Sequence, residues 1–253
     1  MAGSAIIHNV LKKQKPSHKT ENPIKFSLLN TRGLITGSEE TNTYHNKSKF
    51  IHGINNEPGK DHIAATETFL NPDIGDGEIL KSFPEYTLQR CDRDRNAGRK
   101  TIQGGCFLLT SPNISTTRVN SFSKSNRVCE LLTTAHSARD LSILTMYRPP
   151  DTTLTEFTEI LDLAEEHISS SKSSHYVLTG DFNFPPEIVT WSETCSELIP
   201  LPTPCRTADA KKQLQLLLEM ADKHYMHQVV DVPTGEANTL DLLFTTDQVT
   251  SIP

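Results

Sequence analysis

A short run of the sequence, Gly180-Asp181-Phe182-Asn183, places a carboxylate and an amide two residues apart. It follows the apolar segment 176–179, which is typical of a strand, so both side chains share one face of the strand end. A carboxylate there can accept a proton from water, and an amide can donate a hydrogen bond to a phosphate oxygen. Taken alone, the pattern is equally typical of a turn, where Asp, Asn and Gly are common.

Four further polar residues stand at the ends of apolar, strand-like segments. A charge at the edge of such a strand is costly unless it is paired or binds a metal. Converging Asp, Glu, Asn and Tyr side chains form an oxygen-rich site that suits Mg²⁺, which takes one or two carboxylates and shares its other positions with water and phosphate. The four are Asn30 in LLNTRGL, Glu67 in ATETFL, Tyr147 in TMYRPP and Asp241 in NTLDLLF.

The elements that must position these side chains are short strands and a few helices. Apolar residues at steps of three and four predict a helix that begins after Asp151 and a second over 214–225. A short helix is also predicted at about 47–55. Many short strands with interspersed helices predict one large α/β domain of two packed sheets flanked by helices. The predicted strands lie near 24–28, 62–66, 87–90, 104–110, 114–120, 129–132, 142–147, 176–179, 228–232 and 240–244.

Residues 1–23 are polar and lysine-rich without a clear period, which predicts a disordered basic tail before a domain over 24–253. The whole chain of 253 residues has a formal net charge of −6. This acidity argues against a general nucleic-acid binder, but not against an enzyme that uses a metal and a local basic patch. Two interpretations of one basic segment stay open, a nucleic-acid patch or a solvated loop. The segment contains Arg90, Arg93, Arg95, Arg99 and Lys100.

Cysteine usage and hydropathy exclude other classes. The five cysteines form no C-x-x-C pair, which predicts free thiols in a reducing compartment. No stretch approaches the roughly 18 apolar residues of a membrane span. The first ten residues lack the apolar core of a signal peptide, so we expect an intracellular protein without membrane contact.

In their order along the chain, these motifs resemble the endonuclease/exonuclease/phosphatase superfamily. Y-R-P-P, G-D-F-N followed by Trp191, and P-T before N-T-L-D-L-L-F-T are similar to the apurinic-like endonuclease domain of non-LTR retrotransposons. The resemblance covers about residues 24–246. It implies a four-layered α/β sandwich with the site between the upper edges of its two sheets.

The resemblance also implies roles for five residues. Glu67 would be the main ligand of Mg²⁺, or of Mn²⁺ in its place, and Asn30 would help to bind metal and phosphate. Tyr147 and Asn183 would hold the scissile phosphate. Asp181 would orient or deprotonate the attacking water.

Further roles concern DNA and a histidine. Thr234, Arg32 and Arg148 would contact nucleic acid, and Asp241 would orient a catalytic histidine. The sequence departs from the pattern at Gly235, where the family usually has Arg. It also lacks the Ser-Asp-His motif that follows the Asp241 strand in the family. We therefore expect a domain truncated before that motif, with its last strand missing and its activity impaired.

The function that these observations predict is a Mg²⁺-dependent phosphodiesterase, a DNA endonuclease that nicks target DNA in the nucleus and here lacks the polymerase domain of its parent element. The alternative is a non-catalytic remnant that keeps the fold and weak metal or nucleic-acid binding. A third interpretation, the same chemistry on a small phosphate ester, is less consistent with the retrotransposon-like motifs.

Overall fold

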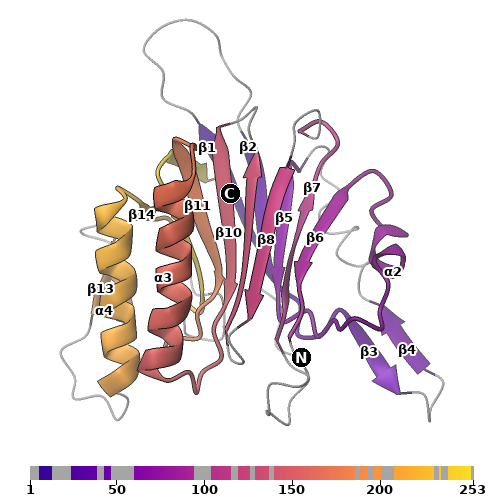
Figure 1. The fold of residues 1–253 in the computed structure, drawn as a ribbon, viewed down its shortest axis with the longest axis horizontal. Helices are drawn as coiled ribbons and strands as arrows, with labels where there is room; N and C mark the ends of the chain where they lie inside the picture. Colours follow the sequence, from indigo (N-terminus) through magenta and orange to yellow (C-terminus); the bar gives the residue numbers. More distant parts are fainter. Residues whose placement is uncertain are drawn as a thin grey trace, which may run out of the picture.

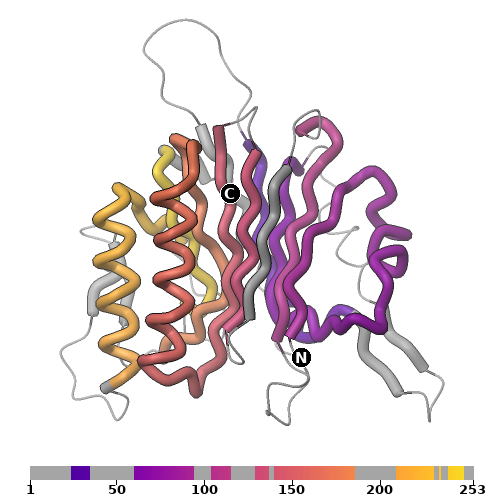
Figure 2. The backbone as a smooth tube through the Cα atoms, in the orientation of Figure 1, coloured from indigo at the N-terminus to yellow at the C-terminus, as the bar shows by residue number. Residues whose placement is uncertain are grey.

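Two six-stranded β-sheets form the centre of the molecule, and helices lie outside them (Figure 1). In sequence order the chain builds most of the first sheet, then the second sheet and its helices (Figure 2). The structure, a computed structural model, describes residues 6–12, 24–38, 43–46, 60–93, 104–114, 119–125, 129–136, 140–185, 189–192, 197–200, 208–230, 234 and 239–251.

The first sheet has the strand order β16-β1-β2-β5-β7-β6. The central strands β2 and β5 run parallel, whereas the other neighbours are antiparallel. The strands are β1 (Ile6–Lys12), β2 (Ile24–Asn30), β5 (His62–Thr66), β6 (Thr87–Cys91), β7 (Cys106–Thr110) and β16 (Gln248–Ser251).

The second sheet has the strand order β14-β15-β11-β10-β9-β8. Here β10 and β11 are the parallel pair, joined through a helix. The strands are β8 (Val119–Ser125), β9 (Glu130–His136), β10 (Leu141–Tyr147), β11 (His175–Asp181), β14 (His227–Gln228) and β15 (Asp241–Thr245).

Three helices and two small hairpins complete the described elements. Helix α3 starts from Thr153, which forms a capping box with Glu156, rather than from Asp151. The hairpins fall in stretches where no strand was predicted. These elements are α2 (Asp76–Leu80), α3 (Leu154–Ser170), α4 (Ala208–Lys223), the pair β3 (Ile35–Ser38) with β4 (Thr43–Asn46), and the pair β12 (Val189–Ser192) with β13 (Glu197–Pro200).

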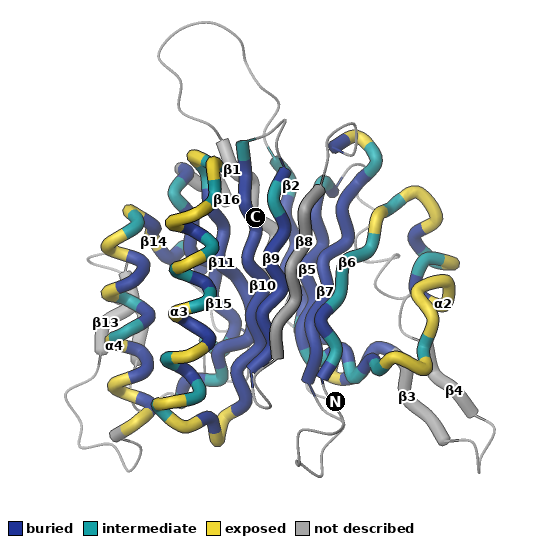
Figure 3. The backbone as a smooth tube through the Cα atoms, in the orientation of Figure 1, coloured by how far each residue is buried: buried dark blue, intermediate teal, exposed yellow. Residues whose placement is uncertain are grey.

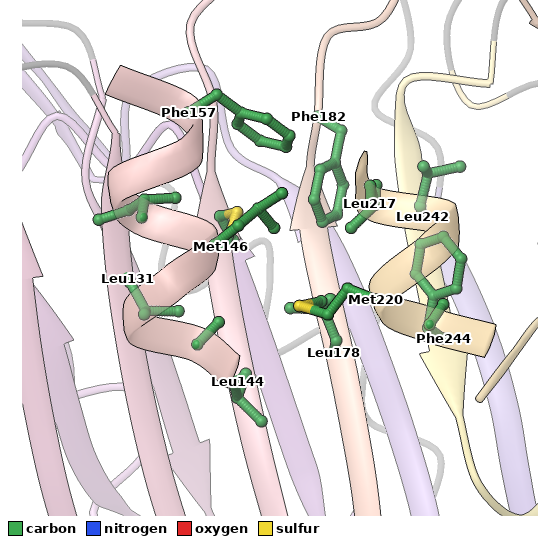
Figure 4. Close-up of a cluster of buried hydrophobic side chains, with 14 of the residues drawn as sticks. Leu131, Leu144, Met146, Phe157, Leu178, Phe182, Leu217, Met220, Leu242 and Phe244 are labelled. Carbon is green, nitrogen blue, oxygen red and sulfur yellow. The ribbon is translucent and has the colours of Figure 1, made fainter. Parts of the chain in front are cut away.

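Three apolar layers hold the sandwich together. The inner layer lies between the two sheets and includes Leu28, Ala64 and Ile143. A second layer lies between the second sheet and the helices α3 and α4, where Phe157 and Leu217 meet the strands (Figure 4). A third layer covers the first sheet beneath α2. Buried residues follow the strands, and exposed residues gather on the outer helices (Figure 3). The predicted four-layered α/β sandwich is confirmed.

Alternation along β10 divides its side chains between two layers. In β10, Leu141 and Ile143 belong to the inner layer, whereas Leu144 and Met146 belong to the helix layer. Tyr147 has the same parity as Ile143, because successive side chains of a strand point to opposite faces. The end of β10 therefore presents Tyr147 to the space between the sheets.

The structure differs from the sequence-based expectation at the start of the chain. Ile6–Lys12, expected within a disordered tail, forms β1, whose backbone pairs with β2 on one side and β16 on the other. The segment carries four aliphatic residues, which suit a strand despite the lysines that follow them. The strand expected over 114–120 lies later, as β8. The helix expected at about 47–55 lies outside the described residues.

The described cysteines, Cys91, Cys106 and Cys129, are free, as predicted, and all three are buried. Cys195 and Cys205 lie outside the described residues. Among the helices that the structure describes, none is long and apolar enough to cross a membrane.

Candidate active site

Four of the predicted site residues lie at strand ends and face the space between the sheets. Asn30 ends β2, Tyr147 ends β10, Asp181 ends β11 and Asp241 begins β15. Tyr147 is the register partner of Asp181, which is in turn the partner of Asp241. All four strand termini therefore meet at the same end of the sandwich.

Side-chain contacts join the two sheets at this end. Asn30 Nδ2, from the first sheet, donates to Asp181 Oδ2 of the second sheet at 2.7 Å. Tyr147 Oη, from the second sheet, donates a long hydrogen bond of 3.4 Å to Glu67 Oε1 of the first. The site is therefore built across the interface between the sheets.

The segment after β5 holds Glu67 in an uncommon conformation. Its φ is 50°, in the left-handed region that non-glycine residues seldom adopt. The carbonyl of Glu67 accepts hydrogen bonds from Gly33 N at 2.7 Å and from Thr31 Oγ1 at 2.9 Å. Such conformations persist where the surroundings enforce them, and they concentrate at functional sites.

The G-D-F-N run shows a second enforced conformation. Asn183 has a φ of 47°, its N–H donates to Asp181 Oδ1 at 3.0 Å, and its Nδ2 donates to the Arg148 carbonyl at 2.9 Å. Gly180 has a φ of 148°, and a Cβ there would lie 1.7 Å from the Met146 carbonyl oxygen. Only glycine allows β11 to approach β10 so closely at this point.

Three carboxylates share this small volume, and each has a raised pKa. Burial raises the pKa of Glu67, although Arg32 and the hydrogen bond from Tyr147 oppose the shift. Burial, followed by the charges of Asp241 and Glu67, raises the pKa of Asp181 well above its usual range. Burial, together with the charge of Glu67, raises the pKa of Asp241 to about 7. When all three groups are ionised, the cluster therefore has a deficit of positive charge, which Arg32 and Arg93 offset only in part.

A divalent cation fits this deficit. Asp241 Oδ1 is buried and has no hydrogen-bond partner among the described residues. Within the same described part of the chain, no three His, Cys, Asp or Glu side chains form a preassembled metal cage. Mg²⁺ does not need one, because it usually takes one or two carboxylates and keeps several waters. Glu67 with Asn30 can supply such a partial set of oxygen ligands.

The residues predicted to contact DNA fall into different environments. Arg32 is exposed, and its charge acts on Glu67 and Asp241, so it lies beside the site. Thr234 is buried, and its hydroxyl oxygen accepts from Leu240 N at 3.0 Å and Asp241 N at 2.9 Å. Thr234 therefore fixes the start of β15, and its contact with DNA stays a prediction.

The assignment of Arg148 to nucleic-acid binding is wrong. Its side chain is 1% exposed and lies over the ring of Phe184 at 4.7 Å. Its Nε donates to Gln213 Oε1 at 2.6 Å, and its Nη1 donates to the carbonyls of Phe182 at 2.8 Å and Asn183 at 3.2 Å. These contacts place Arg148 inside the protein as a support of the G-D-F-N run.

The basic segment that begins at Arg90 in β6 is not a free patch where the structure describes it. Arg90 pairs with Asp92 and Asp76, and Arg93 pairs with the fully buried Glu130. Arg95, Arg99 and Lys100 lie outside the described residues. Sequence reasoning missed Glu130, although its place before the apolar pair Leu131-Leu132 was a signal of a buried charge.

No described histidine takes the place expected beside Asp241. His136 and His175 are both register partners of Leu141, at the opposite end of β10 from Tyr147. The structure thus brings together Glu67 and five other predicted residues, while their individual roles stay predictions. The five are Asn30, Tyr147, Asp181, Asn183 and Asp241.

Comparison with known proteins agrees with this geometry. Residues 141–252, which contribute Tyr147, Asp181, Asn183 and Asp241, match a family described as endonuclease-reverse transcriptase. A search of the curated proteins gives no match for the chain.

Several solved structures share the fold at low sequence identity. The 3′-5′ exonuclease NExo from Neisseria meningitidis aligns with a TM-score of 0.52 at 12% identity, over 87% of this chain and 86% of that one. A variant of the 3′ phosphatase NExo from Neisseria, bound to a product DNA hairpin, aligns with a TM-score of 0.50 at 12% identity, over 79% and 81%. An endonuclease/exonuclease/phosphatase from Bacteroides vulgatus gives 0.50 at 12%, over 88% and 87%. A weaker likeness, with a TM-score of 0.49 at 12% identity over 86% of this chain and 82% of that one, is to the endonuclease domain of TRAS1, a telomere-specific non-LTR retrotransposon.

The resemblance to the superfamily is therefore confirmed. The chain is a protein of the endonuclease/exonuclease/phosphatase fold, and its residues 141–252 match the endonuclease-reverse transcriptase family.

Proposed function

We propose that the chain is a Mg²⁺-dependent phosphodiesterase that nicks DNA, as an endonuclease of the non-LTR retrotransposon type. The observation that carries the proposal is the 2.7 Å bond between Asn30 and Asp181, which closes a carboxylate-rich site across the two sheets. The family matched by residues 141–252 and the DNA product held by NExo support DNA as the substrate. Such an activity would act in the nucleus.

The site residues divide the work as follows. Glu67 and Asn30 would hold Mg²⁺, or Mn²⁺ in its place, and the bound ion would polarise the phosphate and stabilise the leaving oxygen. Asp181, oriented by Asn30 and by the N–H of Asn183, accepts a proton from the attacking water, which its raised pKa favours. When substrate binds, the single hydroxyl hydrogen of Tyr147 would leave Glu67 and donate to the scissile phosphate. Asn183 would donate to the same phosphate with its second amide hydrogen.

Conversion of supercoiled plasmid to nicked circles tests the proposal. The wild type should nick with Mg²⁺ and stop when EDTA is added. Asp181→Asn should lower the rate by at least about 10²-fold, the usual contribution of a positioned general base. Asp162→Asn, an exposed aspartate on α3, is the matched control and should nick at the wild-type rate. Equal nicking by wild type and Asp181→Asn would refute the assignment.

The same proteins decide between catalysis and a non-catalytic domain. A bound ion stabilises the folded state by mass action, so Mg²⁺ should raise the melting temperature of the wild type but not of Glu67→Gln. A wild type that shows this shift and never nicks DNA would be a binding domain. A shift of equal size in both proteins would show that Glu67 is not a ligand of the metal.

A further inference from the structure

A buried ion pair lies next to the proposed site and has no part in the chemistry above. Arg93 Nε donates to Glu130 Oε1 at 2.8 Å, and Arg93 Nη2 donates to Glu130 Oε2 at 3.4 Å. The two side chains are 6% and 0% exposed. A buried ion pair is weak support for stability, because desolvation of both charges offsets most of their attraction. Its presence beside the site therefore points to another role.

The pair links the two sheets at the site end. Arg93 follows β6 of the first sheet, and Glu130 begins β9 of the second. Glu130 is also the register partner of Tyr147 on the neighbouring strand β10. Any shift of one sheet against the other at this end must strain or break the Arg93–Glu130 contact.

The guanidinium of Arg93 also contacts Tyr147 directly. Its central carbon lies 5.5 Å from the centroid of the Tyr147 ring, within the range of a cation–π interaction. Gly104 leaves the room that this arrangement needs, because a Cβ at Gly104 would lie 2.6 Å from Arg93 Nε. The ring that carries the Tyr147 hydroxyl is therefore held from behind by a fixed cation.

The other partner of the pair reaches the segment that holds Glu67. Gly105 N donates to Glu130 Oε2 at 3.2 Å. The carbonyls of Gly104 and Gly105 accept from Phe69 N at 2.9 Å and Thr68 N at 3.3 Å, just after Glu67. Arg93 therefore contacts the Tyr147 ring, and Glu130 is hydrogen-bonded to the backbone that holds the residues after Glu67.

We propose that Arg93 and Glu130 are positioning residues that fix the Tyr147 hydroxyl relative to Glu67 for the phosphodiester reaction. This inference rests on the proposed function. Neither residue touches the substrate; both act through Tyr147. Removal of the pair should therefore lower the rate of the chemical step and leave substrate binding largely intact.

A double-mutant cycle tests this dependence on Tyr147. Arg93→Gln/Glu130→Gln removes both charges and keeps polar side chains of similar size. In the Tyr147 protein it should lower kcat for nicking on the order of 10²-fold, the size expected of a small misplacement, with KM changed less than about threefold. In Tyr147→Phe the same double substitution should change kcat less than about threefold, because coupled residues are non-additive. Equal losses in both backgrounds would overturn the proposal.

A spectroscopic arm works without catalysis. The protein labelled with 3-fluorotyrosine should give a Tyr147 ¹⁹F resonance, assigned through its absence in Tyr147→Phe. Arg93→Gln/Glu130→Gln should shift that resonance, and an unshifted signal would overturn the proposal. If the wild type never nicks DNA, the proposed function fails while this arm still decides whether the pair holds the ring.

Two further variants complete the design. Arg90→Gln is the matched control: it breaks a neighbouring ion pair with Asp92 and Asp76, away from Tyr147, and should change neither kcat nor the Tyr147 resonance. A comparable change in Arg90→Gln would overturn the proposal. If the double variant does not fold, Arg93→Lys, which keeps the charge and loses the planar contact, takes its place in both measurements with the same expected direction.

Discussion

At the scale of single residues, Asp241 has a well-bound backbone and a carboxylate in which one oxygen is left without a partner among the described residues. Its N–H is bound by the Thr234 hydroxyl, whereas its Oδ1 has no partner among the described residues. Burial raises its pKa to about 7 from a usual value of 3.8. A group with a raised pKa in the folded state stabilises the fold below its unfolded pKa and loses that contribution as pH rises through the folded value. At pH 8 without metal, Asp241 therefore destabilises the fold.

Asp241→Asn should consequently stabilise the metal-free protein at pH 8. The free energy of unfolding should rise by about 1–3 kcal/mol, since one pKa unit corresponds to 1.36 kcal/mol and some of the shift reflects relaxed surroundings. The new amide can donate to Asp181, its register partner. Urea unfolding at pH 8 and pH 4 measures the effect, which should vanish at pH 4. Asp162→Asn is the exposed control, and a loss of stability for Asp241→Asn at pH 8 contradicts the prediction.

At the scale of elements, helix α4 supports the site through one buried amide. Gln213 Oε1 accepts from Arg148 Nε at 2.6 Å, and Gln213 Nε2 donates to the Thr152 carbonyl at 2.8 Å. Arg148 in turn donates to the carbonyls of Phe182 and Asn183, which follow β11. One polar chain therefore connects α4, the segment before α3 and the loop that carries Asn183.

Replacement of Gln213 should break this chain of contacts. Gln213→Leu leaves Arg148 Nε and the Thr152 carbonyl buried without partners, at a cost of about 1–3 kcal/mol for each neutral group and more for a charged one. Gln213→Glu should lose less, because it still accepts from Arg148. Urea unfolding measures both variants. Gln215→Leu, at an exposed position of the same helix, is the control and should stay within about 0.5 kcal/mol of the wild type.

The sequence predicts helices and strands well where the apolar residues follow a clear period. It predicts side-chain contacts poorly where the two partners lie far apart in the sequence. Strand-end polarity was sufficient to place Asn30, Tyr147 and Asp181 on one face, because parity along an apolar strand fixes the face of its last residue. Parity does not place Glu67, which follows β5 in a left-handed conformation. The same reasoning can indicate that a charged residue is buried, as it does for Glu130, but it cannot identify the residue that pairs with it. Glu130 lies 37 residues from Arg93 in sequence, and no neighbouring residue indicates that the two are in contact.

Arg148 shows the same limit in the opposite direction. Its place in the Y-R-P-P motif suggested a contact with DNA, yet its guanidinium is enclosed by Phe157, Phe184 and the main chain. Strand β1 was missed for a related reason, since one of its two pairing partners, β16, lies at the other end of the chain. The local sequence indicates whether a segment forms a helix or a strand, whereas contacts with distant segments decide which polar groups are buried.

At the scale of the whole molecule, the end of the sandwich opposite the site contains two buried imidazoles. The rings of His62 and His136 lie with centroids 4.8 Å apart, and both side chains are fully buried. Burial lowers the pKa of His136 to about 4 from a usual 6.5. The unfolded chain therefore binds a proton at this residue below pH 6.5, whereas the folded protein does so only near pH 4. The contribution to stability is full above pH 6.5 and is lost as pH falls toward 4.

His136→Phe should remove this acid sensitivity. Between pH 7.5 and pH 5.0 the wild type should lose about 2 kcal/mol more of its free energy of unfolding than His136→Phe does, since about 1.5 pKa units of the shift are then engaged. Urea unfolding at the two pH values measures the difference. His227→Phe, at an exposed position, should show the wild-type dependence. Equal losses of unfolding free energy in wild type and His136→Phe would show that another residue causes the acid sensitivity.

The inner layer between the sheets has a consequence for how such a chain changes over generations. Glu67 follows one sheet and Asp181 ends the other, so the thickness of the inner layer sets the distance between them. Ala64, fully buried in that layer, lies three residues before Glu67. A larger side chain there acts as a wedge that separates Asn30 from Asp181 while burying more apolar surface. In a gene copy that is no longer under selection for DNA cleavage, interior substitutions of this kind abolish the activity while the fold is retained. Every site residue is then still present in an inactive protein.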